Sequence, residues 1–458
     1  MLAALPDPVL YRILLHAVPP PGARTTPLRY RLLLRLSKVC RSLARVAQEL
    51  LYAHIDILTL DKLRALRIAV DGPESAPRAR LLAFNKARSL RVSAPAKGYD
   101  KYRLGPVHVA KLVLDLPPIR EAWFDGVNLN PLDLSWAVNL ESLHLHEVTL
   151  VAPVQPSKWN VSSPWEAWYF PNLRFLSLSK VTVSSEPGHP HPSLRRLLHP
   201  VSFSKLTSLA ISYDASTAEP IFRHLAPQLE RLWLRRTSHP YLQDKLPSLP
   251  VDELALCTAK LRHLACDLHR TRDLEVLSEL GAESTILIHR QRRSGGAESP
   301  DTKMARADSH SSSGSSSSRS TTVVSLPPYP WSDDAPSLRL RSFRLESPQV
   351  AAAERAFLTH PGLEWLPSLY ALAVSRSANL YSSAPRPTKA EVEHFKEQRR
   401  ATVEVCARAG IEVSELPFVD PEGGAEYQEY ELARWTEWCD EVDARVEEEE
   451  ELARGGAR

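Results

Sequence analysis

The feature that most constrains this chain is a short apolar pattern, leucine-x-x-leucine-x-leucine, that recurs along its middle. The two longest copies run from Leu140 to Leu150 and from Leu173 to Val183. Apolar residues at alternate positions predict a strand with one buried face, and a polar or proline-containing connection follows each copy. Because leucine is by far the commonest residue, one match is expected by chance, but eight in succession are not. We therefore expect a row of short strands built from one repeated unit.

The remaining copies keep this spacing with some irregularity. In the middle region they are Val109/Leu112/Leu114, Ile119/Ala122/Phe124, Leu206/Leu209/Ile211, Leu229/Leu232/Leu234, Val251/Leu254/Leu256 and Leu261/Leu264/Cys266. The pattern returns at Leu340/Phe343/Leu345 and Leu369/Leu372/Val374. Successive copies in the middle region lie about 10 to 33 residues apart, which overlaps the roughly 20–29 residues of leucine-rich repeats. The fold class predicted is α+β or α/β: a short N-terminal helical domain, then an irregular leucine-rich-repeat solenoid of parallel strands with helices or loops between them.

Shifts in composition divide the chain into five stretches. They are a helical domain over 1–57, leucine-rich-like repeats over 58–289, a disordered Ser/Arg/Pro-rich insertion over 290–336, the last repeats with a terminal helix and strand over 337–416, and an acidic tail over 417–458. The insertion lacks the apolar residues that would offset the entropy of ordering it. The terminal helix should open with the capping box Thr388-x-x-Glu391 and end at Gly410, before a last strand at Ile411–Val413.

The acidic tail is expected to be a solvated helix. It contains Trp435 and Trp438 and then the glutamate run Glu447–Glu451. Because a run of like charges usually faces water, we expect this run to be solvated.

Charge, cysteine usage and hydropathy narrow the class of protein. The chain has 57 lysines and arginines against 54 aspartates and glutamates, a formal net charge of +3, which does not indicate a strongly basic nucleic-acid protein. Five scattered cysteines without a Cys-x-x-Cys pair favour a reducing compartment. No apolar run approaches the ~20 residues that span a bilayer, and the N-terminus lacks the pattern of a signal peptide. We expect a soluble protein of the cytoplasm, the nucleus or both.

Catalytic and metal-binding motifs are absent from the sequence. Phosphate-binding glycine loops, the zinc-protease helix and the hydrolase nucleophile elbow do not occur. The nearest approach to a metal cluster is Cys257, His263, Cys266 and His269, but a strand would place His263 and His269 on one side and Cys266 on the other. Cys40 lies on the apolar side of a predicted helix, which favours a buried, inert thiol. We expect no enzyme activity, no cofactor and no metal.

The first fifty residues carry a second pattern. It opens with Leu5-Pro6, continues with a short amphipathic helix, and after a loop gives the triplet Val39-Cys40-Arg41. This order resembles the F-box, and with the repeats that follow, the whole chain resembles the F-box proteins of fungi. It departs from the family pattern at Pro8, where Glu is frequent, at Leu43, where Trp is usual, and in a longer loop over Pro19–Tyr30.

The resemblance implies an adaptor rather than an enzyme. In that family the F-box docks on the Skp-type linker of a cullin-RING ubiquitin ligase, and the repeats hold the protein to be ubiquitylated. The partners implied are a Skp-type linker protein, through it a cullin, and an unknown protein substrate, without nucleic acid or membrane. The positions that match the motif are Leu5, Pro6, Val9, Leu10, Ile13, Leu14, Leu36, Val39, Cys40, Leu51 and Tyr52. The alternative is a leucine-rich-repeat scaffold whose N-terminal helices only cap the array, without a ubiquitin role.

A substrate surface is predicted on the strand face opposite the leucines. Side chains at alternate strand positions point away from the core, and solenoids commonly bind partners on such a face. The outward residues selected are Glu121, Trp123, Asp125, His144, His146, Arg231, Trp233 and Arg235. Large aromatic residues beside charges have the composition of a binding hot spot. The alternative for Trp123 and Trp233 is that a long connection or the terminal helix covers them, and the alternative for the two histidines is a plain exposed surface.

Overall fold

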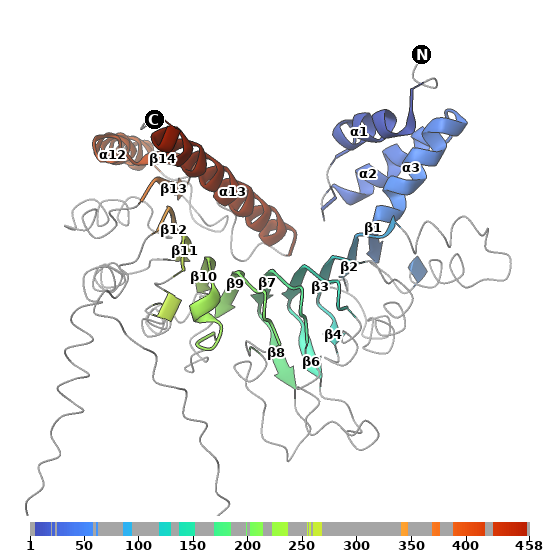
Figure 1. The fold of residues 1–458 in the computed structure, drawn as a ribbon, viewed down its shortest axis with the longest axis horizontal. Helices are drawn as coiled ribbons and strands as arrows, with labels where there is room; N and C mark the ends of the chain where they lie inside the picture. The colour runs from blue at the N-terminus through green and yellow to red at the C-terminus, as the bar shows by residue number, and fades with distance from the viewer. Residues whose placement is uncertain are drawn as a thin grey trace, which may run out of the picture.

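The computed structural model shows an α/β fold in which three N-terminal helices precede a parallel sheet (Figure 1). The residues that it describes are 5–19, 21–22, 25–57, 61–62, 86–93, 119–129, 137–151, 169–184, 198, 202–213, 222–236, 254, 256–257, 260–267, 340–346, 369–375, 388–416 and 425–455. The expected strand at Val109/Leu112/Leu114 and the expected disordered insertion over 290–336 lie outside these residues. Within the described residues, no helix is both long enough and apolar enough to cross a membrane.

The N-terminal helices form a small unit with its own core. They are α1 (Asp7–Ala17), α2 (Thr26–Leu36) and α3 (Arg41–Ala53). Asp7 stands in the first turn of α1, and Pro6 is its N-cap. Leucines from all three helices pack together, and Leu10, Leu33 and Leu50 are fully buried. Helix α3 runs directly into the first strand, which ties the helical unit to the sheet.

The main sheet keeps the order of the chain. Its strands in the described residues, in spatial order, are β1 (His54–Ile57), β2 (Ser89–Ser93), β3 (Glu121–Asp125), β5 (Ser142–His146), β7 (Phe175–Ser179), β9 (Ser208–Tyr213), β10 (Arg231–Arg236), β11 (His263–Asp267), β12 (Ser342–Glu346), β13 (Ala371–Ser375) and β14 (Glu412–Leu416). Every neighbouring pair is parallel. The row bends into an arc, so one face is concave and the other convex (Figure 1).

The repeated leucines form the core on the convex side of the arc. Leu143, Leu176 and Leu209 are register partners on β5, β7 and β9, and all three are fully buried in one continuous cluster. Full burial of each such side chain contributes about 1.5–3 kcal/mol, so stacked identical positions stabilise the sheet cooperatively. The prediction of strands with one apolar face is confirmed for the copies on β3, β5, β7 and β9 to β13.

A second, smaller sheet follows the corner after three of these strands. It consists of β4 (Asn128–Leu129), β6 (Thr149–Val151) and β8 (Thr182–Ser184), again parallel. The residues that turn each corner are Gly126, Glu147 and Lys180, and all three have positive φ angles, of 63°, 50° and 51°. The same unusual conformation at the same place in three successive units is what a structural repeat requires.

Two strand predictions need correction. The copy Val251/Leu254/Leu256 is not a strand, because residues 254, 256 and 257 are helical and Leu254 packs into the convex core from that conformation. A leucine triplet at this spacing also fits one side of a helix, so the pattern alone does not distinguish the two. Conversely, the sequence pattern missed β1 and β2, which are short and carry Asp56 and Arg91 among their apolar residues.

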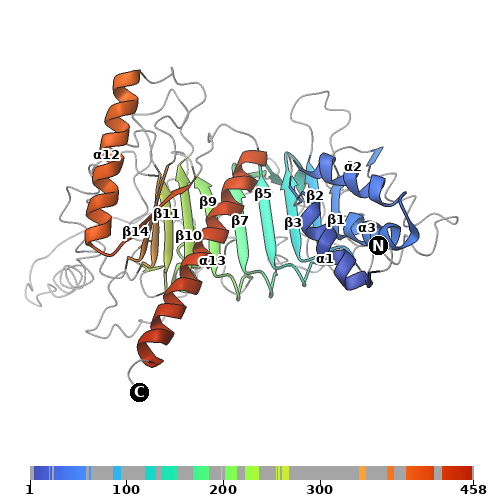
Figure 2. The same ribbon diagram turned by 90° about the horizontal axis from the view of Figure 1, so that it is seen from above.

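The C-terminal region supplies two long helices. Helix α12 (Lys389–Arg408) begins with the predicted capping box, in which Glu391 donates its backbone N–H to Thr388 Oγ1 and its carboxylate accepts from the Thr388 backbone. Helix α13 (Ala425–Gly455) lies inside the arc and crosses the concave face obliquely (Figures 1 and 2). The glutamate run Glu447–Glu451 is exposed, as predicted, but the helix before it is not solvated on all sides, since Trp435 is 0% exposed and Trp438 is 4% exposed.

Candidate functional site

The N-terminal helices divide the residues predicted to bind a linker protein into two groups. Leu10 and Leu14 are buried in the unit's own core, so they do not form part of an open surface. Leu5, Leu36, Cys40 and Leu51 are partly buried and pack against that core, and Tyr52 packs against the core of the sheet. The exposed members are Pro6, Val9, Ile13 and Val39.

Exposed apolar side chains are concentrated on this helical unit. Val9 is 43% exposed, Ile13 39% and Val39 67%, and Leu15, Leu28 and Leu34 are exposed as well. Val9 and Ile13 are four residues apart on α1 and therefore share one helix face. Elsewhere in the described residues, the exposed large apolar side chains are scattered singly over Val138, Tyr169, Val403, Tyr430 and Leu452. A local concentration of exposed apolar residues is typical of a partner-binding surface.

The predicted substrate surface has two parts that differ in exposure. Around β10 it is covered, because Trp233 is 4% exposed and Arg235 5% exposed. The cover is α13: Trp233 packs against Trp435, with ring centroids 5.5 Å apart. The prediction that Trp233 and Arg235 face an open surface is wrong. The alternative that Trp233 is covered holds, but the cover is α13, in the acidic tail, rather than the terminal helix α12 or a long connection.

Buried charges fix α13 against the middle of the concave face. Glu431 is fully buried and lies 3.0 Å from Arg235 and 3.6 Å from Arg344. Both guanidinium groups also lie over the Trp233 ring, at 5.8 Å and 5.0 Å from its centroid. Removing Glu431 would take this carboxylate away from two buried guanidinium groups, which is costly. This pairing specifies one position of the helix on the sheet.

A second cluster, at Asp443, joins α13 to the amino ends of the strands. Arg231 and Arg341 donate to the Asp443 carboxylate at 3.1 Å and 2.8 Å, and the His263 Nε2 atom lies 3.0 Å from it. Burial opposes ionisation of Asp443, but the hydrogen bonds and positive charges around it prevail and hold its pKa well below the ordinary value. Arg231, predicted as a substrate contact, is thus used inside the protein, where it also pairs with Asp440 at 2.7 Å.

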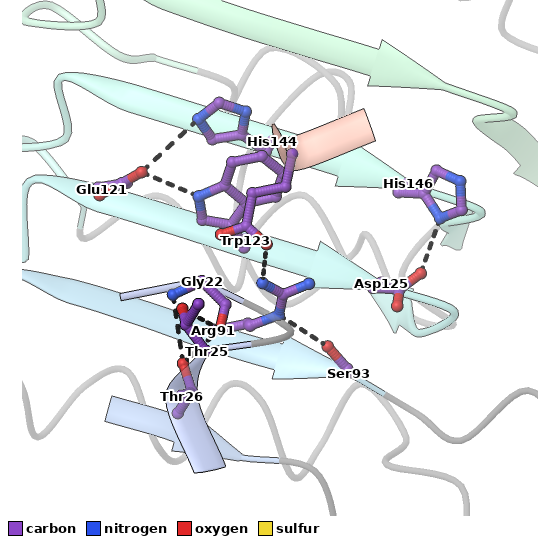
Figure 3. A network of polar contacts seen from close by, with 11 residues as sticks. Gly22, Thr25, Thr26, Arg91, Ser93, Glu121, Trp123, Asp125, His144 and His146 are labelled. Carbon is purple, nitrogen blue, oxygen red and sulfur yellow. Dashed lines mark hydrogen bonds and ion pairs between the residues drawn. The ribbon is translucent and has the colours of Figure 1, made fainter. Parts of the chain in front are cut away.

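The part of the concave face on β3 and β5 is partly covered, because Trp123 is half-buried and packs against the apolar cluster that α13 forms with the sheet. Trp123 stacks on His144, with ring centroids 3.6 Å apart and planes 3° apart, and its Nε1–H donates to Glu121 at 2.9 Å (Figure 3). Asp125 lies 2.7 Å from the His146 ring nitrogen. Both histidines are buried, so their interpretation as a plain exposed surface is wrong. Burial, reinforced by the charge of Arg91, lowers the pKa of His144 to about 3, and it is therefore neutral at physiological pH.

A small cleft lies where the helical unit, the first strands and the start of α13 meet. It is lined by Gly22, Arg29, Tyr30, Arg91, Trp123 and Glu429, among others. Arg91 on β2 forms an ion pair with Glu429 on α13. Arg29 is fully buried and donates to the Pro19 carbonyl at 2.7 Å, and burial raises the pKa of Tyr30 to about 12. These groups hold three parts of the chain together.

The sequence analysis missed Arg29, Arg91, Glu429, Glu431 and Asp443, whose partners lie far away in the chain. One signal was available for α13. Leu432, Trp435, Cys439, Val442 and Val446 follow one another at steps of three and four residues, which predicts a helix with one buried face. The glutamates between them obscured this period.

Within the described residues, no group of three or more histidine, cysteine, aspartate or glutamate side chains is arranged to hold a metal ion. Cys257 and Cys266 belong to the convex core, whereas His263 lies on the concave side with Asp443, as the strand alternation predicted. His269 lies outside the described residues. Comparison with protein-family models and with curated proteins finds no match to this chain.

Proposed function

We propose that the chain is the substrate-recognition adaptor of a Skp–cullin–F-box type ubiquitin ligase. In this proposal the helical unit α1–α3 is an F-box-like domain that docks on a Skp-type linker protein, and the sheet is an irregular leucine-rich-repeat solenoid that holds the target. The observation that carries the proposal is the concentration of exposed apolar side chains on the helical unit, among them Val9, Ile13 and Val39. Burial of each of these side chains by a partner would contribute about 1.5–3 kcal/mol.

The regular architecture of the sheet supports its proposed role as a solenoid. The strands are parallel and in chain order, and the corners at Gly126, Glu147 and Lys180 repeat the same backbone conformation. Repeat arrays present extended concave surfaces for binding other proteins. With the middle of this surface occupied by α13, we place the substrate contacts of the concave face on β3 and β5, at Glu121, Trp123 and Asp125.

The linker surface can be tested with residues that do not belong to the core. We expect the double substitution Val9→Asp with Ile13→Asp to abolish co-purification with a co-expressed Skp-type linker protein, because it places two charges in an apolar interface. Thermal stability should change little, since exposed substitutions usually stay within about 0.5 kcal/mol. A substitution of Leu10 is unsuitable, because its loss from the core would cost about 2–5 kcal/mol by itself.

Val403→Asp is the matched control, because Val403 is 44% exposed on α12 and lies outside the helical unit. It should leave co-purification with the linker unchanged. If the Val9/Ile13 variant retains the linker as well as the Val403 variant does, the docking assignment is wrong.

One observation favours the second candidate function, a leucine-rich scaffold whose helices only cap the array. The Tyr30 hydroxyl donates to the His54 carbonyl at 2.7 Å and accepts from the Asp56 backbone N–H at 3.0 Å, so α2 is bonded along the first strand. Such contacts are what a cap of the sheet end requires. A wild-type chain that folds stably but never co-purifies with any Skp-type linker would support this function over the adaptor.

A further inference from the structure

A line of positively charged residues borders the sheet at the amino ends of its first strands. Arg88, Arg120, Glu141 and Arg174 each directly precede a strand, and they are aligned by backbone hydrogen bonds. The Arg120 N–H donates to the Arg88 carbonyl at 2.8 Å, the Glu141 N–H to Arg120 at 2.7 Å and the Arg174 N–H to Glu141 at 2.8 Å. Since neighbouring strands are about 4.8 Å apart, Arg88 and Arg174 are separated by about 14 Å along this edge. We call this line, together with Lys205, the basic rim.

The basic rim is exposed and has little internal compensation. Arg88, Arg120, Arg174 and Lys205 are all exposed and line a shallow depression with Asn139, Glu141 and Asn172. Glu141 lies 3.5 Å from Arg120. Lys205 donates to the Asn172 side-chain oxygen at 2.8 Å, which holds the ammonium at the depression. Within the part of the chain that the structure describes, Arg88 and Arg174 form no ion pair.

The same edge continues beneath α13, and there acidic residues of α13 contact it. The ladder of backbone bonds runs on through Arg262 to Arg341 and Tyr370. Arg341 binds Asp443 at 2.8 Å and lies 3.6 Å from Glu450, and the Tyr370 hydroxyl donates to Glu449 at 2.8 Å. The carboxyl end of α13 reaches past the sheet at this edge (Figure 2). The segment 425–455 has twelve acidic and three basic residues, so one half of the edge already binds an acidic helix.

We propose that the basic rim binds an acidic polypeptide segment of another protein, in the way that the far half of the same edge binds α13. The rim presents fixed cations over about 14 Å, which matches nine to ten residues of a helix at 1.5 Å per residue. Aspartates and glutamates on one helix face would pair with Arg88, Arg120 and Arg174 through charge-assisted hydrogen bonds. The identification of this partner as the protein to be ubiquitylated rests on the proposed function, whereas the binding itself does not.

The composition of the rim favours an acidic polypeptide over a nucleic acid. Glu141 stands in the middle of the line, where it would repel a continuous phosphate backbone, but a peptide can place a neutral residue there. The residues that line the depression include no aromatic side chain on which bases could stack. The amide side chains of Asn139 and Asn172 suit a polypeptide, with its mixture of donors and acceptors.

The test uses the full chain and a fluorescein-labelled deca-glutamate peptide, with binding followed by fluorescence anisotropy at physiological ionic strength. The wild-type protein should bind the peptide, and a deca-glutamine peptide should not bind. The double variant Arg120→Glu with Arg174→Glu should bind at least about tenfold more weakly, since two charge-assisted contacts become repulsive. The milder variant Arg120→Gln with Arg174→Gln should bind the peptide with an affinity between those of the wild type and the charge-reversed variant. An intermediate affinity shows that the weaker binding does not come from unfolding of the edge by the reversed charges.

The matched control is Lys389→Glu with Arg400→Glu, which makes the same change in net charge on exposed positions of α12. Equal peptide affinity in the rim variant and in this control would overturn the proposal. The proposal would also be overturned if single-stranded DNA of equal charge bound more tightly than the peptide and the rim variant abolished this DNA binding. Co-purification of the rim variant with the Skp-type linker reports separately on the proposed function: peptide binding without any linker binding keeps the rim and rejects the adaptor.

Discussion

At the scale of single residues, the concave face shows how a buried histidine can make folding sensitive to acid. His144 stacks on Trp123 and is fully enclosed, and burial together with the charge of Arg91 lowers its pKa to about 3. In the unfolded chain the same imidazole titrates near its ordinary pKa of about 6.5. The unfolded state therefore takes up a proton at mildly acidic pH while the folded state does not. A lowered pKa of this kind contributes stability that is present above about pH 6.5 and is lost as pH falls toward the pKa of the folded state.

We expect the free energy of unfolding of the wild type to fall by about 2 kcal/mol between about pH 7 and pH 5 through His144 alone. The variant His144→Phe, which keeps an aromatic ring against Trp123, should lose that share of the pH dependence. Urea titrations at the two pH values measure it. Because burial also lowers the pKa of His54 and His263, the variant keeps some dependence, and the decisive quantity is its difference from the wild type. An equal change in the free energy of unfolding between the two pH values in both proteins would contradict the lowered pKa of His144.

At the scale of elements, α13 is the feature that the sequence pattern predicted least well. Its glutamates indicated a solvated helix, whereas its apolar residues at steps of three and four form the second core of the protein. A helix polar over most of its surface docks here because its few buried charges meet cations of the sheet: Glu431 meets Arg235 and Arg344. The partners lie almost 200 residues away in one case and nearly 90 in the other, so local pattern could not reveal them.

The docking of α13 predicts a large difference between two substitutions on the same helix. Trp435→Ala should destabilise the protein by about 3–5 kcal/mol, because it empties a fully buried site against Trp233. Tyr430→Ala, at a half-exposed position five residues earlier, should change stability by less than about 0.5 kcal/mol. Chemical denaturation of both variants measures the difference. If Trp435→Ala cost no more than Tyr430→Ala, α13 would not be packed on the sheet.

The sequence pattern predicted the strands better than it predicted α13. Alternating leucines predicted β3, β5, β7 and β9 to β13, because one buried face leaves a period of two in the sequence. The same reasoning failed for Leu254, where the spacing also suits a helix. It also missed β1 and β2, although Ile55/Ile57 and Leu90/Val92 keep the alternation, because each strand offers only two apolar residues. For the concave face, alternation correctly assigned direction to Trp233 and Arg235 but not exposure, since exposure depends on a segment at the other end of the chain.

At the scale of the whole molecule, α13 joins the two ends of the arc. Its Glu429 pairs with Arg91 on β2, and its Asp443 binds Arg341, which precedes β12. These two acids are fourteen residues apart, about 21 Å along the helix. Their partners are seven strand steps apart, about 34 Å along the sheet. The helix therefore spans the concave side of the curved sheet in a straight line (Figure 1). It stabilises the curvature by an ion pair near each end and by apolar contacts between them.

Removal of α13 is the most general test of the architecture. A chain that ends after β14, at residue 416, should still form the convex core, because the repeated leucines do not contact α13. It should nevertheless melt at a lower temperature than the full chain, and it should expose Trp233, whose fluorescence then shifts to longer wavelength. A synthetic peptide of residues 425–455, added in trans, should bind the truncated chain and restore both the melting temperature and the emission maximum.

The charges on α13 make this rescue specific. A peptide with Glu431→Gln and Asp443→Asn should restore less, because Arg235, Arg344, Arg231 and Arg341 would lose their buried or half-buried carboxylate partners. A peptide with Glu437→Gln, a position whose ion pair to Arg434 is exposed and lies within the helix, should restore as well as the natural sequence does. Truncation without any change in melting temperature or tryptophan emission would show that α13 is not required to hold the arc. Equal rescue by all three peptides would show that the apolar contacts, rather than the buried ion pairs, decide where the helix binds.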